Sequence, residues 1–142
     1  MNEVPSGDAA AELELAHETL RAAEVLRAAG LHRHAVGRAY YAVFHAACSL
    51  LARIGRHART HEGVRGLVNE HFVRPGLLAH EHARTLRQTA GDRNDADYDA
   101  RATFTASDAE DDVRRARAFL EAVEAILAAD GQGPGDGSAP AP

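Results

Sequence analysis

The segment AVGRAYYAVFHAACSLL, residues 35–51, decides the fold of this chain of 142 residues. Its large apolar side chains recur at steps of three and four residues, which is the period of one face of an α-helix. A second stripe lies on the far side of the same helix and contains Arg38, Tyr41, His45 and Cys48. Because both sides carry bulky side chains, we expect residues 32–54 to form a central helix with neighbours on two sides.

Helical periodicity continues before and after this segment. It predicts a helix over residues 9–29 that ends at Gly30, and a shorter helix that follows an N-cap at Thr60. The pair Pro75-Gly76 is typical of a break and ends the shorter helix.

Two further helices are expected in the second half of the chain. The fourth runs from about residue 78 to residue 88 or beyond, frays at the Gly91-Asp92 pair and gives way to an acidic stretch. The last begins near Thr105 or Ser107, with Ser107 and Glu110 as its capping box. No window alternates as a strand does, so the expected fold is an all-α bundle of four to five helices.

Composition sets the domain boundaries. The length fits one domain, and 45% of the residues are apolar, which is ordinary for a globular protein. Residues 1–8 and the segment GQGPGDGSAPAP, residues 131–142, have too few large apolar side chains to form a core. We therefore expect a helical domain over residues 9–130 between two disordered ends.

Charge and cysteine content restrict the classes of function. A net charge of −5 argues against a protein that coats nucleic acid without specificity. Between Glu24 and Glu62, however, the sequence has no acidic residue and six arginines. The single cysteine, the absence of an export signal and the short apolar stretch at residues 46–52 predict a cytoplasmic protein without a membrane anchor.

Metal and cofactor sites have little support in the sequence. His57 and His61 are four residues apart, but the glutamate of a zinc-protease motif is missing. Asp95, Asp97 and Asp99 alternate like calcium ligands, but the glycine and glutamate of that loop are also missing. The glycine-rich motifs that bind nucleotides are missing too. We expect neither a metal nor a cofactor.

Two arginine-based groups are candidate sites. Arg38 and His45 are seven residues apart, so both project from one side of the central helix, where an arginine could hold a phosphate and a histidine could move a proton. Arg93-Asn94, followed by Tyr98, would gather a cation, an amide and a phenol. The alternative is structural: Arg38 pairs with a buried acid, His45 is a satisfied interior histidine, and Arg93 is tied to Asp97 in a capped loop.

The segments at residues 35–51, 60–78 (THEGVRGLVNEHFVRPGLL) and 93–99 (RNDADYD) resemble the HEPN domain, the higher eukaryotes and prokaryotes nucleotide-binding domain. The resemblance implies an antiparallel helical bundle that commonly forms a homodimer. It also implies the toxin half or partner half of a toxin–antitoxin pair, with a minimal nucleotidyltransferase as the antitoxin. Many members of the family are metal-independent RNases.

Active members carry an Arg and, four to six positions later, a His. Here Arg93-Asn94 matches the start of that motif, but Tyr98 stands in place of the His, so it is open whether the chain is an enzyme. If it is a ribonuclease, the expected roles are phosphate stabilisation by Arg93 and Arg38, proton transfer by His45, and hydrogen bonding by Asn94 or Tyr98. In some relatives the partner adds AMP to a tyrosine, and Tyr98 is the candidate.

Three functions therefore remain open. The first is a HEPN protein of toxin–antitoxin type that binds RNA or a nucleotide and can cleave RNA. The second is a non-catalytic helical module that docks a nucleotidyltransferase partner. The third is a plain helical dimer whose Arg and His residues serve packing and ion pairs.

Overall fold

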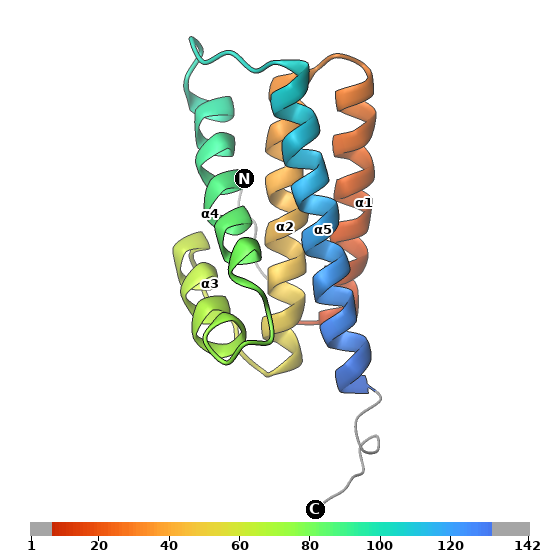
Figure 1. The fold of residues 1–142 in the computed structure, drawn as a ribbon, viewed down its shortest axis with the longest axis vertical. Coiled ribbons are helices and arrows are strands. Elements are labelled where there is room, and N and C mark those ends of the chain that lie inside the picture. The colour runs from red at the N-terminus through yellow and green to blue at the C-terminus, as the bar shows by residue number, and fades with distance from the viewer. Residues whose placement is uncertain (1–6, 132–142) are drawn as a thin grey trace, which may run out of the picture.

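A computed structural model describes residues 7–131, and this part of the chain is all-α, without a strand. The helices are α1 (Ala9–Ala28), α2 (His32–Arg53), α3 (His61–Val68), α4 (His80–Tyr98) and α5 (Ala106–Gly131). A single π-helical turn, Asn69–Val73, continues α3. The expected bundle of four to five helices is confirmed (Figure 1).

The second helix is the centre of the bundle. Every residue from Ala39 to Leu51 is buried, and α2 contacts α1, α3, α4 and α5. The interior combines large side chains of α2 with those of α5 and of the α3–α4 region; the largest fully buried ones include Tyr40, Phe44, Leu50, Leu51, Val64, Val68, Leu78, Phe119 and Leu120. Bulky residues on both sides of α2 thus have the two sets of neighbours that the sequence predicts.

The remaining helices lie around α2 in two groups. The long helices α1, α2 and α5 run side by side, while α4 packs on the other side of α2 with α3 beside its lower half (Figure 1). The turn from α1 to α2 contains Gly30, whose φ of 80° is the left-handed conformation that favours glycine. Both α4 and α5 pack mainly against α2 and little against each other.

Side-chain caps fix several helix starts. Oδ1 of Asp8 accepts a hydrogen bond from the amide of Ala11 at the start of α1. Thr60 caps α3 as predicted, because its hydroxyl accepts the amide of Gly63 at 2.9 Å. Such caps satisfy amides that have no partner inside the helix.

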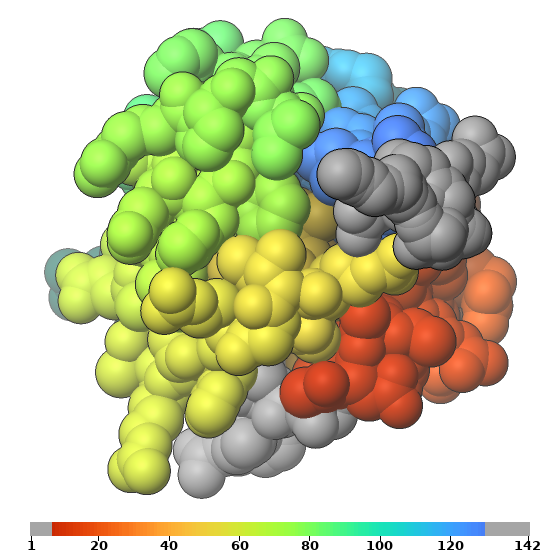
Figure 2. Space-filling view, turned by 90° about the horizontal axis from the view of Figure 1, so that it is seen from below, coloured from red at the N-terminus to blue at the C-terminus, as the bar shows by residue number. Residues whose placement is uncertain are grey.

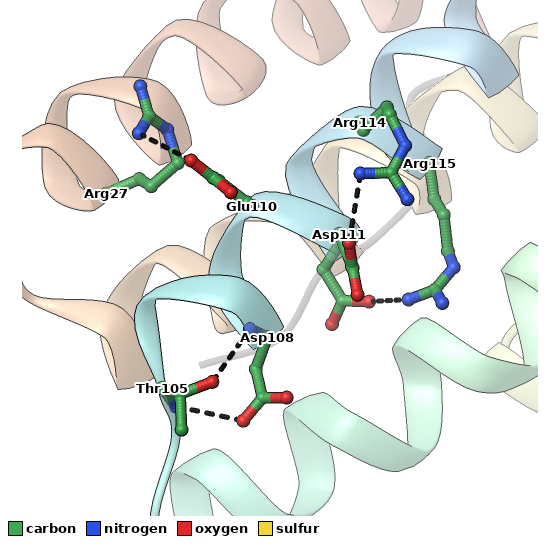
Figure 3. Close-up of polar contacts among 8 residues, drawn as sticks. Arg27, Thr105, Asp108, Glu110, Asp111, Arg114 and Arg115 are labelled. Carbon is green, nitrogen blue, oxygen red and sulfur yellow. Dashed lines mark hydrogen bonds and ion pairs between the residues drawn. The ribbon is translucent and has the colours of Figure 1, made fainter.

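The capping box of α5 is formed by a different pair of residues from the predicted one. The amide of Thr105 donates to Oδ2 of Asp108 at 2.9 Å, and the amide of Asp108 donates to the hydroxyl of Thr105 at 3.0 Å (Figure 3). Thr105 and Asp108 form the reciprocal pair, while Ser107 and Glu110 do not. Asp reaches the backbone here with a side chain one methylene shorter than the usual Glu.

The fourth helix is longer than expected. It continues through Gly91 and ends at Tyr98, so Arg93 to Tyr98 form its last turns and not a loop. The cost of about 1 kcal/mol for a glycine inside a helix is overcome by packing on α2.

The two ends of the chain extend beyond the described residues. The expected disordered segments, residues 1–8 and 131–142, lie outside them except for Gly7, Asp8 and Gly131. Among the described helices, none combines the length and the apolar character needed to cross a membrane.

Candidate functional site

Arg93 joins α4 to α2. Its Nη2 donates a hydrogen bond to the hydroxyl of Tyr41 at 2.5 Å, and its Nε lies 3.0 Å from Oδ2 of Asp97 one turn later. The Arg93 side chain is 20% exposed. Burial lowers the pKa of Arg93. Tyr41 and Asp97 raise this pKa by more than burial lowers it, so the net shift is upward. The guanidinium therefore remains a permanent cation in a partly dry site.

All three tyrosines of the sequence surround this cation. The ζ carbon of Arg93 lies 5.9 Å from the ring centre of Tyr40, 5.2 Å from that of Tyr41 and 5.7 Å from that of Tyr98. Tyr40 and Tyr41 are buried, and burial raises the pKa of Tyr40. Rings within about 6 Å attract a cation through their quadrupole. We call Arg93 and these three residues the arginine–tyrosine cluster.

Arg38 adds a second cation to the cluster. Its ζ carbon lies 5.0 Å from the ring centre of Tyr41, so that ring is shared with Arg93. Unlike Arg93, Arg38 is exposed, and no carboxylate in residues 7–131 forms an ion pair with it. The structure therefore brings together Arg38, Arg93 and Tyr98 from the predicted site residues.

Asp97 lies between the two helices. A Cβ built on Gly37 would come 3.6 Å from Oδ1 of Asp97, so this carboxylate rests against the backbone of α2 next to Arg38. The predicted tie between Arg93 and Asp97 exists, but inside a helix. It places an anion at the Nε edge of the guanidinium, where an incoming phosphate would also bind.

The end of α4 is fixed by a residue that sequence analysis missed. Arg33, in the first turn of α2, donates from Nη1 to the carbonyl of Ala96 at 2.6 Å and from Nη2 to the carbonyl of Ala102 at 2.5 Å. It also stacks on Phe104. Carbonyls at a helix end lack partners within the helix, and one planar guanidinium satisfies several of them. The partners lie more than sixty residues away, so no local pattern indicates them.

His45 turns to a different neighbour. Its Nδ1 lies 2.8 Å from Oε1 of Glu12 in α1, and the two side chains are 5% and 3% exposed. Arg38 and His45 start from one side of α2, but Arg38 reaches solvent over Tyr41 while His45 is enclosed against α1. His45 therefore bonds to α1, whereas Arg93 reaches α2 from α4 through Tyr41.

Another histidine lies beside the cluster. His61, the first residue of α3, has its Nδ1 2.8 Å from the hydroxyl of Tyr40, and its ring centre is 6.2 Å from that of Tyr41. Sequence analysis considered His61 only as a metal ligand. Its place next to two tyrosines depends on how α3 folds back on α2, and no spacing within the sequence shows this.

The remaining predicted residues are at the surface. Asn94 is exposed, and Tyr98 is 72% exposed although its ring contacts Arg93. Within the part of the chain that the structure describes, no three His, Cys, Asp or Glu side chains are grouped so that they could hold a metal ion.

Fold and site together define a helical bundle in which a cation-rich aromatic cluster joins the second and fourth helices. A sequence model of the HEPN domain matches residues 9–126, which include every residue of this cluster. The chain belongs to the HEPN domain family.

Several curated sequences resemble the chain. "Putative toxin MJ0605" of Methanocaldococcus jannaschii is 33% identical over 115 residues, which is 81% of this chain and 85% of that protein. "Putative toxin MJ0142" of the same organism is 27% identical over 81% of this chain and 78% of its own length. A "UPF0332 protein" of Thermotoga maritima is 31% identical over 66% of this chain and 70% of its own length.

Proposed function

We propose that this chain is a toxin of the HEPN family that binds the phosphate backbone of RNA at Arg38 and Arg93. The observation that carries the proposal is the sharing of one ring, that of Tyr41, by two guanidiniums. Two like charges that both lie within about 5 Å of one ring repel each other, and a bridging phosphate would remove this repulsion. Relatives named as toxins support the biological role.

Exposed groups beside the two arginines could bind the base and the ribose of a nucleotide. Tyr98 offers a ring on which a base can stack, and the amide of Asn94 can donate to or accept from a base or ribose. The net charge of −5 restricts binding to such a local site, because the protein as a whole repels phosphate.

Cleavage of the bound RNA is the finer proposal. Arg38 and Arg93 would stabilise the charge on the phosphate, and Tyr98 or Asn94 would hydrogen-bond to the scissile group. Proton transfer by His45 has no geometric support, because its Nδ1 is held by Glu12 in the interior. Binding is therefore the function that the geometry supports best.

The test is binding of a labelled single-stranded RNA, measured by fluorescence anisotropy over a range of salt concentrations. Arg38→Ala is expected to weaken binding about tenfold. It should also reduce the slope of log affinity against log salt concentration by about one, because one phosphate contact is lost. Arg87→Ala is the matched control, because Arg87 is exposed on α4 but belongs to no contact of the cluster. Equal binding by the two variants would refute the site.

The same proteins should be incubated with total RNA in EDTA. Cleavage that disappears in Arg38→Ala and Arg93→Ala, but remains in His45→Gln, would establish a metal-independent RNase that does not use His45. Cleavage lost in His45→Gln, with folding intact by circular dichroism, would contradict our structural assignment of that histidine.

A second candidate function is that of a module controlled by a nucleotidyltransferase antitoxin. Tyr98 favours it, because its side chain is 72% exposed while its ring contacts Arg93. AMP attached to its hydroxyl would place a phosphate next to the cations that we assign to RNA. The test is incubation with a minimal nucleotidyltransferase and labelled ATP, in which Tyr98→Phe should abolish labelling. A homodimer, in which two clusters face each other, is part of the same proposal and is tested by sedimentation equilibrium.

A further inference from the structure

Two adjoining hollows lie along α5. The polar one faces α4, and the apolar one faces the end of α2 and the segment that leads into α4. One hollow is an apolar cavity of about 710 Å³, lined by residues such as Ile54, Phe72, Leu77 and Ile126. The other is a polar hollow of about 380 Å³ with Arg84, Arg114 and Arg115 in its lining. We call the two hollows together the α4–α5 groove.

The two hollows form one elongated surface. His82 lines both of them, and on α5 the polar hollow ends at Ala118, one turn before the apolar one begins at Ala122. From Arg114 to Ala129 the groove follows α5 for about 22 Å at the usual helical rise. The end of α5 and the segment that leads into α4 meet at the lower end of the molecule (Figure 2).

The lining of the polar hollow contains three arginines and one acidic residue. Arg84 is exposed and pairs with no carboxylate in residues 7–131. Arg114 contacts Asp111 one turn earlier on α5 at 2.9 Å (Figure 3). Arg115 contacts Asp112 in the same way at 2.8 Å. Among the lining residues, Glu81 is the acidic one. In the described structure, Nδ1 of His82 is also buried without a hydrogen-bond partner.

The apolar end of the groove exposes two large side chains. Leu77 is 60% exposed and Ile54 is 42% exposed, and both border the same cavity. Contiguous apolar surface with a charged margin marks an interaction site more often than isolated apolar residues do.

We propose that the α4–α5 groove binds an amphipathic helix of a protein partner, with large apolar side chains in the cavity and carboxylates on Arg84 and Arg114. The proposal rests on the proposed function, in which a protein antitoxin controls this chain. The groove is longer than a single small ligand, and its length matches about four turns of a helix. Charge complementarity selects an acidic segment.

Other occupants fit less well. Residues 131–142 of this chain contain no apolar side chain larger than that of proline, so they cannot fill a cavity lined by leucine and isoleucine. A second copy related by a twofold axis along the groove would bring Arg84 and Arg114 against the same arginines. Both remain distinguishable outcomes of the test.

The probe is a labelled synthetic helix with two leucines near one end and two glutamates about eleven residues further along the same face. Binding to the full chain is measured by fluorescence anisotropy. Leu77→Glu and Arg84→Glu are each expected to weaken binding at least tenfold. The matched controls are Val25→Glu and Arg87→Glu, which change an exposed apolar residue and an exposed arginine outside the groove.

Each other result overturns the proposal. Absence of binding, equal loss in the control variants, or unchanged binding after replacement of the glutamates by lysines excludes an acidic helix. Loss of a dimer in Leu77→Glu, seen by sedimentation, assigns the groove to a second copy, and competition by a peptide of residues 131–142 assigns it to the chain itself. RNA binding by the same variants is measured separately, so failure of the groove and failure of the RNA site are distinguishable.

Discussion

Nδ1 of His45 in α2 and Oε1 of Glu12 in α1 form a buried pair at 2.8 Å. Neither group is reached by solvent to any useful extent, since their side chains are 5% and 3% exposed. Removal of one member leaves the other without that partner in the interior, and such losses cost about 3 kcal/mol or more. The pair therefore fastens α1 to α2.

Glu12→Ala is expected to reduce the free energy of unfolding by about 3 kcal/mol, measured by urea denaturation. Glu14→Ala, two residues away and exposed, is the control and should change it by less than about 0.5 kcal/mol. The double variant Glu12→Ala/His45→Ala should lose less free energy of unfolding than the two single variants lose together. Strict additivity would show that the pair contributes nothing.

Asp97→Asn is expected to strengthen RNA binding several-fold. The carboxylate lies 3.0 Å from Nε of Arg93, and its removal frees that edge of the guanidinium for phosphate. Asp95→Asn, which removes an exposed charge in the same turns of α4, controls for the change in net charge. An equal gain in both variants, measured by anisotropy, would mean that only the overall charge matters.

Arg33→Met is expected to loosen the end of α4, because the carbonyls of Ala96 and Ala102 lose their donor. Hydrogen exchange of amides near residues 96–102 should accelerate at least tenfold, while the middle of α2 is unaffected. Arg33→Lys should not restore protection, since an ammonium group cannot reach two carbonyls with a planar fork. Full protection in the lysine variant would show that charge alone is sufficient.

Thr105→Ala is expected to destabilise the protein by about 1 kcal/mol, because the amide of Asp108 loses its acceptor. Ser107→Ala serves as the comparison and should have almost no effect on the unfolding midpoint in urea. A larger effect at Ser107 would support the capping box that the sequence pattern indicates and contradict the observed one.

Asp112 makes stability depend on pH. Burial and the adjacent carboxyl of Asp92 raise its pKa from 3.8 to about 7, against the opposing effect of Arg115. Between these two values the folded state keeps a proton that the unfolded state has released. Stability must therefore fall as the pH rises from about 4 to 7, by at most about 1.4 kcal/mol per pH unit for this group.

Asp112→Asn should remove this dependence. The variant is expected to gain stability relative to the unaltered protein as the pH rises through that window, measured by urea denaturation at several pH values. Asp111→Asn, whose carboxylate also pairs with an arginine but is 39% exposed, should run parallel to the unaltered protein. Parallel curves for both variants would exclude a raised pKa at Asp112.

The helices could be predicted because their causes are local. The apolar stripes of residues 32–54 and the cap at Thr60 act within a few residues, and both are confirmed. The fraying predicted at Gly91 and the capping box predicted at Ser107 and Glu110 are wrong because non-local contacts decide both. Packing of α4 on α2 outweighs the weak helix propensity of glycine, and the geometry of the turn before α5 selects the capping residue.

The site could be predicted only in part for the same reason. Arg38, Arg93 and Tyr98 carry signals within their own segments, and the structure places them in one cluster. His61 and Arg33 act on residues that are distant along the chain, so only the folded arrangement reveals them. His45 shows the opposite case. Its spacing from Arg38 suggests a role in proton transfer, but in the structure it bonds to Glu12 and joins α2 to α1.

The separate packing of α4 and α5 on α2 has a consequence for motion. Since α4 rests mainly on α2, we expect it to detach while α1, α2 and α5 stay folded, in a partial opening below the free energy of global unfolding. Such an opening would separate Arg93 from Tyr41 and, at the same time, remove the α4 side of the α4–α5 groove. A partner bound in the groove would therefore suppress such openings and keep the RNA site at the end of α4 assembled, which would couple the two binding events.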